Sequence, residues 1–153
     1  MRRASARGYA IFEIVIVLAV FGIILAITVP AVQTYLDRTR VAQAITDIGQ
    51  MQATIKQYSR TKGVFPDSLA DVSLDTRTDP WGDAYQYFNL VTAKGNGKAR
   101  KDKKLNPLNS DYDLYSMGAD GQSKSQLTNA VSRDDVVRAR DGGFIGLAAD
   151  FDP

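Results

Sequence analysis

The sequence contains no cysteine and no histidine. Without cysteine the chain has neither disulfides nor a thiol nucleophile, and without histidine it has neither a Ser-His-Asp triad nor the common zinc sites. An excess of one charge is also missing. The formal charge of +2 includes three arginines before Gly8, and the remaining side chains sum to −1. This balance argues against a general attraction to nucleic acid. The absences favour a non-enzymatic protein.

The chain does have one long apolar run, which extends from Tyr9 to Val32 and contains a single charged residue, Glu13. About 24 residues at 1.5 Å each are enough to span the roughly 30 Å hydrocarbon layer of a bilayer. An ionised carboxylate at the bilayer centre costs roughly 3 kcal/mol, so an intramembrane acid is treated as a functional position that needs a partner. Arginines at positions 2, 3 and 7 favour a cytoplasmic N-terminus.

Two other interpretations of this segment stay open. A secretory signal also begins with basic residues and continues with an apolar stretch, but it is removed downstream at a small-residue site and seldom carries an acid. A simple membrane anchor for an unrelated periplasmic domain would account for the length of the run and leave Glu13 unexplained.

The residues from Arg7 to Ile14, followed by the apolar run and Val29 to Val32, resemble the class III signal of the type IV pilin and pseudopilin family. The resemblance implies that a prepilin peptidase cleaves between Gly8 and Tyr9 and methylates the new N-terminus. Tyr9 stands where phenylalanine is usual. Glu13 would be the fifth residue of the mature chain, placed to neutralise the Tyr9 amine of a neighbouring subunit during assembly.

The apolar pattern continues beyond the run with helical spacing. Spacings of three and four on one face predict an amphipathic helix that continues the first one and ends before Gly63 and Pro66. Pro30 lacks a backbone N–H, so we expect a kink or melted turn near it, and the resemblance gives this region a role in assembly. The residues of the stripe are Val41, Ile45, Ile48, Met51 or Gln52, Ile55 and Tyr58.

The remaining sequence predicts a small sheet that covers this stripe. Strand-forming residues gather at 84–91, 111–117 and 143–151, and a helical turn is expected at 66–72. Trp81 is interpreted as a core or turn anchor. We therefore predict an α+β fold in which a long N-terminal helix packs on about three antiparallel strands. The expected divisions are a cleaved leader (1–8), a transmembrane and polymerisation helix (9–32), an amphipathic helix (33–62) and a periplasmic globular domain (63–153).

A basic segment lies between the first two expected strands. Like charges repel one another, so this segment is interpreted mainly as a solvated loop, with contact to an acidic surface as the alternative. No aromatic residues alternate with its cations, which counts against stacking on nucleic acid. Its basic residues are Lys94, Lys98, Arg100, Lys101, Lys103 and Lys104.

The segment Asp111 to Gly121, with Asp79-Pro80-Trp81-Gly82 before a tyrosine-rich strand, resembles the major pseudopilin of type II secretion systems. That resemblance implies a calcium ion bound by backbone carbonyls and aspartates, and calcium prefers six to eight oxygen ligands. Carried over here, the ligands would be the carbonyls of Leu114, Ser116 and Met117 and the carboxylate of Asp120, with either Asp134 or Asp135 as the second acid. Ser132 to Asp135 can equally be read as the N-cap and first turn of a helix. The continuation to a third strand departs from the pseudopilin pattern.

The resemblances together predict a filament subunit of the type II secretion pseudopilus. It would be a single-pass inner-membrane protein with a periplasmic C-terminal domain, assembling as a helical homo-oligomer. The implied partners are the prepilin peptidase, an inner-membrane assembly platform and minor pseudopilins. A type IV pilus subunit for adhesion, twitching or DNA uptake is the first alternative, although the missing cysteines argue mildly against a disulfide-closed pilin. A membrane-anchored binding or enzymatic domain is the second.

Overall fold

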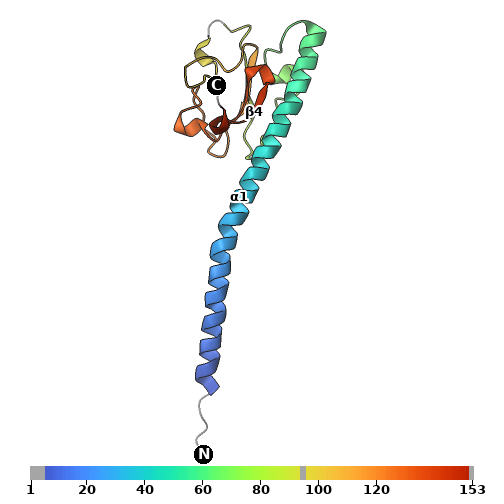
Figure 1. The fold of residues 1–153 in the computed structure, drawn as a ribbon. Helices are drawn as coiled ribbons and strands as arrows, with labels where there is room; N and C mark the ends of the chain where they lie inside the picture. The colour runs from blue at the N-terminus through green and yellow to red at the C-terminus, as the bar shows by residue number, and fades with distance from the viewer. Residues whose placement is uncertain (1–5, 94–95, 152–153) are drawn as a thin grey trace, which may run out of the picture. The chain divides into compact units, whose positions relative to one another are not determined.

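A computed structural model describes residues 6–93 and 96–151, and their side chains from residue 11 onward except at Asn96. The chain divides into two compact units, Met1–Arg38 and Thr39–Pro153. One helix, α1 (Ala6–Lys62), runs through both units (Figure 1). The predicted cleavage site at Gly8 and Tyr9 falls in its first turns, where the side chains are outside the described set, and residues 1–5 of the leader lie outside the described residues.

The first unit is a stretch of helix whose side chains from Ile11 to Arg38 are all exposed. The helix continues through Pro30 without interruption, so the melted turn expected there is absent from this structure. The carbonyl oxygen of Pro30 accepts a hydrogen bond of 3.0 Å from the Thr34 hydroxyl. One helix in the described part of the chain, within Ile11–Lys62, is long and apolar enough to cross a membrane.

In the second unit the helix presents the predicted apolar stripe to the rest of the fold. Ile48, Met51 and Ile55 are fully buried, and so is Ala44, which the apolar pattern did not single out. Val41 and Ile45 pack at the margin of the same core. The helix ends at Lys62, where the Gly63 N–H donates to the Ser59 carbonyl at 2.8 Å. Helical periodicity therefore predicted the buried face, and Gly63 and Pro66 predicted where the helix ends.

The sheet has four antiparallel strands rather than the three predicted. In chain order they pair β1 to β2 to β3 to β4, and the sheet lies against the second half of α1 (Figure 1). The bounds are β1 Gln86–Asn89, β2 Tyr112–Ser116, β3 Val136–Ala139 and β4 Phe144–Leu147. The strand that the sequence analysis missed is β3. Its Val137 pairs with Tyr115 of β2 on one side and with Gly146 of β4 on the other.

The structure also corrects the helical reading of Ser132 to Asp135. The only helical element described beside it is a short 3-10 turn, Ala130–Ser132, capped by Asn129. The Ser132 hydroxyl is buried and instead holds the backbone of Lys124, accepting from its N–H at 2.8 Å and donating to its carbonyl at 3.1 Å. The predicted turn near 66–72 is confirmed as a 3-10 helix, Leu69–Val72, with a capping box between Ser68 and Asp71.

Two apolar clusters hold the sheet in place. The first lies between α1 and one face of the sheet, where Tyr112, Leu114 and Val136 meet the helix stripe. Trp81 packs at its margin, in agreement with the predicted anchor role. The second cluster lies on the other side of β3 and includes Leu108, Leu127 and Val137. Because β3 contributes to both clusters, it is buried along its whole length.

Candidate functional site

The first candidate region is the apolar helix of the first unit. Its large side chains are well exposed, for example Ile11 at 66% and Ile27 at 68% of their full areas. Exposure of this kind over several turns is energetically unfavourable in water, at about 25 cal/mol per Å² of apolar surface. Glu13 is exposed on the same segment. The isolated chain therefore leaves this surface, including Glu13, to be covered by lipid or by other chains.

The second candidate region is the β2–β3 loop, residues 117–135, which contains the predicted calcium carboxylates. The Asp134 carboxylate contacts the backbone at Asp120: one of its oxygens accepts from the N–H groups of Ala119 at 2.9 Å and Asp120 at 3.1 Å. The Asp120 carboxylate accepts the Gln122 N–H at 2.8 Å. Both acids are thus used to shape the turn that follows β2.

Gly118 makes this turn possible. Its φ of +68° is a left-handed conformation that favours glycine, and a Cβ at this position would run into the backbone carbonyl of Asp134. The two ends of the loop therefore meet where the backbone of Gly118 closely approaches the backbone of Asp134.

Asp135 lies apart from this turn and is fully buried. One of its oxygens accepts from Arg100 Nη2 at 2.5 Å and from the Ser123 hydroxyl at 2.6 Å. Burial raises the pKa of Asp135, even though the Ser123 hydroxyl and the Arg100 guanidinium act in the opposite direction. The short contacts with Arg100 and Ser123 pair this carboxylate through one of its oxygens.

Arg100 corrects the picture of a fully solvated basic loop. Its side chain is only 3% exposed, whereas Lys98, Lys103 and Lys104 are exposed as predicted. Lys101 is half-buried, and Lys94 lies outside the described residues. Arg100 also lies over the ring of Tyr115, with 4.2 Å from the guanidinium carbon to the ring centroid. Nothing in the local sequence distinguished this cation from its neighbours.

The predicted carbonyl ligands belong mostly to the sheet. Leu114 is buried in β2 opposite Tyr87 of β1, and Ser116 pairs with Val136 of β3. The Ser116 hydroxyl donates to Asp79 at 2.5 Å, while Met117 begins the loop. Ser116 thereby ties β2 to the Asp79-Pro80-Trp81-Gly82 turn, where the N–H groups of Trp81, Gly82 and the following Asp83 donate to the other oxygen of Asp79.

The oxygen atoms of these predicted ligands do not fit a calcium ion. In the described part of the chain, no three acidic, histidine or cysteine side chains come together as metal ligands. One buried oxygen of Asp135 lacks a hydrogen-bond partner among the described residues, and this oxygen would suit a cation. Calcium prefers six to eight oxygens, and the neighbouring acids are already bound to N–H donors or to arginine.

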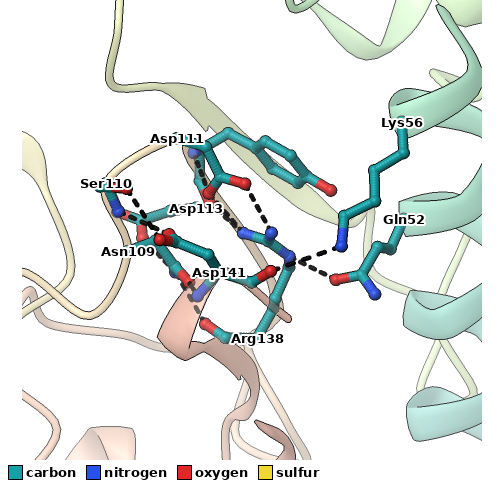
Figure 2. A network of polar contacts seen from close by, with 9 residues as sticks. Gln52, Lys56, Asn109, Ser110, Asp111, Asp113, Arg138 and Asp141 are labelled. Atoms are coloured by element: carbon teal, nitrogen blue, oxygen red, sulfur yellow. Dashed lines mark hydrogen bonds and ion pairs between the residues drawn. The ribbon is translucent and has the colours of Figure 1, made fainter. Parts of the chain in front are cut away.

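A second buried arginine, Arg138 of β3, joins the sheet to α1 (Figure 2). Its two terminal nitrogens bind both oxygens of Asp111 at 2.7 Å, and its Nε donates to Gln52 Oε1 at 2.6 Å. The guanidinium also donates to the carbonyl of Tyr112 at 2.8 Å and stacks on the Tyr112 ring at 3.9 Å. Burial raises the pKa of the Tyr112 hydroxyl to about 12.

Around Arg138, polar groups from β2 and from two loops close the network shown in Figure 2. Asn109 donates from its amide to Asp113 and to the Arg138 carbonyl, both at 2.9 Å. Burial raises the pKa of Asp113, against the opposing effect of the Arg100 backbone N–H. Asp141 accepts from the Ser110 N–H at 2.7 Å and its hydroxyl at 2.8 Å. Hydrogen bonds to the Asp141 carboxylate hold its pKa below the usual value, although burial opposes them.

The turn that carries Asp141 also meets the helix directly. Lys56 donates from Nζ to the carbonyl oxygen of Asp141 at 3.4 Å. Gly142 follows with φ of +92°, and any side chain there would collide with the Gln52 amide. The sequence predictions missed this network, because its members are spread between residues 52 and 141 and no local motif joins them.

Three relatives show what the chain is similar to. The type II secretion system core protein G of Pseudomonas aeruginosa is 27% identical over 143 residues, covering 80% of this chain and 89% of that protein. A fimbrial protein of Neisseria meningitidis is 26% identical over 140 residues, covering 88% of this chain and 80% of its own length. The fimbrial protein EcpC of Eikenella corrodens is 33% identical over 66 residues, or 43% of each chain. No family model and no solved structure matches the chain.

Proposed function

Since the chain belongs to the type IV pilin and pseudopilin family, we propose that it is the filament subunit of the pseudopilus of a type II secretion system. The carrying observation is the similarity to a type II secretion core protein over most of both chains. The relatives are structural subunits and not enzymes, which agrees with the composition. The proposal gives the chain a mechanical role, in which copies of the folded unit are stacked by their N-terminal helices.

Assembly would use the exposed helix of the first unit. In the membrane, lipid covers its apolar side chains, and in the filament, the helices of other subunits would do so. Because lipid is as apolar as the packed helices, the change of environment alone gives little driving force or register. A polar contact is needed to select one axial position, and Glu13 is the one acid available on residues 9–32.

The proposed counter-ion is the α-amino group created by cleavage between Gly8 and Tyr9. A prepilin peptidase would expose and methylate this amine on the cytoplasmic side of the inner membrane. Methylation keeps the positive charge, so the amine of one subunit could still pair with Glu13 of another. The assembly platform and minor pseudopilins would then feed and start the filament, with the globular units on the periplasmic side.

Substitution of Glu13 tests the assembly mechanism. Glu13→Ala and Glu13→Gln should insert and be processed as the wild type but form no filaments, whereas Glu13→Asp should retain part of the filament yield. Val17→Ala is a matched control, because it removes apolar volume on the same exposed helix and leaves the charge unchanged. The measurements are filament yield after shearing or overexpression and the mass of the mature N-terminus. Wild-type filament yield in Glu13→Gln would exclude the ion pair.

A type IV pilus subunit is the alternative, and the two fimbrial relatives favour it. Deletion of the gene separates the two functions in the producing organism. Loss of exoprotein secretion with surface pili retained would support the pseudopilus, and loss of pili with secretion retained would support the pilus. Complementation with the wild-type gene and with the Glu13→Gln variant shows whether either phenotype depends on assembly.

A further inference from the structure

The β2–β3 loop is built around a buried cation that belongs to the chain itself. The Arg100 backbone N–H donates to Asp113 at 2.7 Å, and its guanidinium binds Asp135 at 2.5 Å and the Ser123 hydroxyl. With Tyr115 below the guanidinium plane, this single residue contacts β2, the β2–β3 loop and the residue that precedes β3. Arg100 thus occupies the centre of the loop.

Flanking backbone pairs fix Arg100 in this place. The N–H of Lys101 donates to the Ser125 carbonyl at 2.7 Å, and the N–H of Leu127 donates to the Lys101 carbonyl at 3.0 Å. On the other side, the Leu108 N–H donates to the Arg100 carbonyl at 2.9 Å. The arginine is therefore inserted between the loop and the sheet by main-chain hydrogen bonds, which differs from a flexible surface cation that meets an acid by chance.

The positive charge of Arg100 compensates the negative charge of Asp135. A fully buried carboxylate is unfavourable unless a cation and hydrogen bonds compensate for its lost hydration. Asp135 is fully buried and has the guanidinium and the Ser123 hydroxyl on one oxygen. A divalent cation placed at the same carboxylate would face the arginine as a like charge in a region of low dielectric. The local charge balance leaves no need for a metal.

We propose that Arg100 is the resident cation of the β2–β3 loop, and that this loop folds and stays closed without calcium. At the exposed end of the loop, the N–H groups of Ala119 and Asp120 donate to the Asp134 carboxylate and take the place that a metal ion would have. The loop resembles a family segment for which calcium is implied, and in this chain an arginine and backbone amides would replace the ion.

The metal half of the proposal is tested on the wild-type full chain in detergent micelles. Trp81 is the only tryptophan in the sequence and packs against the core of the globular unit, so its fluorescence follows unfolding of that unit. Melting is recorded in 1 mM CaCl2 and in 1 mM EGTA. The expected Tm values agree within about 1 °C. A ligand present at 100 times its Kd would raise Tm by on the order of 10 °C, so a rise of several degrees in calcium overturns the proposal.

The arginine half is tested with three variants in EGTA. Arg100→Gln leaves Asp135 buried without a counter-ion and should lower Tm by about 10 °C or more. The double variant Arg100→Gln with Asp135→Asn should melt at a higher temperature than Arg100→Gln alone, since the uncompensated charge is gone. Arg133→Gln is the matched control, because Arg133 is exposed in the same loop, and its Tm should stay within about 2 °C of the wild type.

Two outcomes would overturn the arginine half: an unchanged Tm in Arg100→Gln, or a double variant that melts no higher than Arg100→Gln. If Arg100→Gln does not fold, the calcium comparison on the wild type still decides the first half. None of these measurements involves filament formation, so their failure would leave the proposed function untouched, and failure of the Glu13 experiment would leave this inference untouched.

Discussion

The two halves of α1 differ in how their apolar residues are covered. Residues 11–38 expose every side chain in the isolated chain, while the second half buries Ile48, Met51 and Ile55 completely against the sheet. The first half is apolar on all sides, as expected for a segment that meets lipid or other helices, and the second half is apolar along one stripe. One continuous helix can therefore combine a segment stabilised by its surroundings with one stabilised by its own fold.

The largest expected effect is a loss of core packing in the second half only. Ile48→Ala removes a fully buried side chain and should lower the free energy of unfolding of the globular unit by about 3 to 4 kcal/mol. Ile24→Ala is the matched control in the first half, where Ile24 is 54% exposed, and should leave this free energy unchanged. Urea titrations followed by Trp81 fluorescence measure both. Equal losses would contradict the division of the helix into two kinds of surface.

A somewhat smaller effect is expected from Arg138, which fixes the second half to β3. Arg138→Met should lower the free energy of unfolding by about 3 kcal/mol, because Asp111 and the Gln52 amide lose their shared partner. Arg138→Lys keeps the charge but not the two-pronged contact with Asp111, so an intermediate loss is expected. The same urea titration applies. If lysine restored full stability, the charge alone would account for the contact, and the fork geometry would not matter.

Backbone geometry in the β2–β3 loop should have an effect of about 2 kcal/mol. Gly118→Ala forces a side chain into a left-handed conformation and against the Asp134 carbonyl, which lowers stability. Gly49→Ala is the control in α1, where an added Cβ meets nothing within 4 Å. Because alanine favours helix more than glycine does, Gly49→Ala should be neutral or slightly stabilising. Thermal melts should show a lower Tm for Gly118→Ala and an unchanged or slightly higher Tm for Gly49→Ala, and equal melts would contradict the tight turn at Gly118.

The smallest effect concerns acid stability at the turn that contacts Lys56. The pKa of Asp141 is lowered in the folded chain, so its contribution to stability is present above the unfolded pKa of about 3.9 and is lost as the pH falls below it. Asp141→Asn should therefore reduce the drop in stability between about pH 5 and pH 3. Burial raises the pKa of Asp113 and Asp135, so their contribution to stability changes with pH in the opposite direction. Unfolding curves at several pH values, with Asp75→Asn as a surface control, isolate the difference.

Sequence patterns predicted the parts of the fold that depend on neighbours along the chain. The two helical segments, the end near Gly63 and the turn at Leu69–Val72 all follow from local periodicity and caps. β3 was missed because Arg138 interrupts its apolar residues, so Val136–Ala139 did not read as a buried strand. Burial of an arginine there depends on Asp111 and Gln52, which the local pattern does not contain.

The contacts of the predicted calcium-site residues likewise differ in how far the local sequence indicates them. The structure brings the Asp120 backbone N–H to the Asp134 carboxylate at the turn with Gly118, and the predicted role of the two acids as calcium ligands stays a prediction. The partner of Asp135 could not be predicted, because Arg100 was one of several basic residues in a polar segment. The processing and assembly residues Gly8, Tyr9, Glu13 and Pro30 stay predictions, which a single chain without membrane or neighbours does not test.

The sequence by itself determined that the chain has a long apolar helix with one acid, followed by a one-sided helix and a small sheet. Such features depend on spacing and composition, which are local. Only the tertiary structure decided which charges are buried: Arg100 meets an acid 35 residues away, and Arg138 meets one 27 residues away. The physical reason is that a buried charge is tolerated only where folding brings its counter-ion and hydrogen bonds to it, and that meeting depends on the whole sheet.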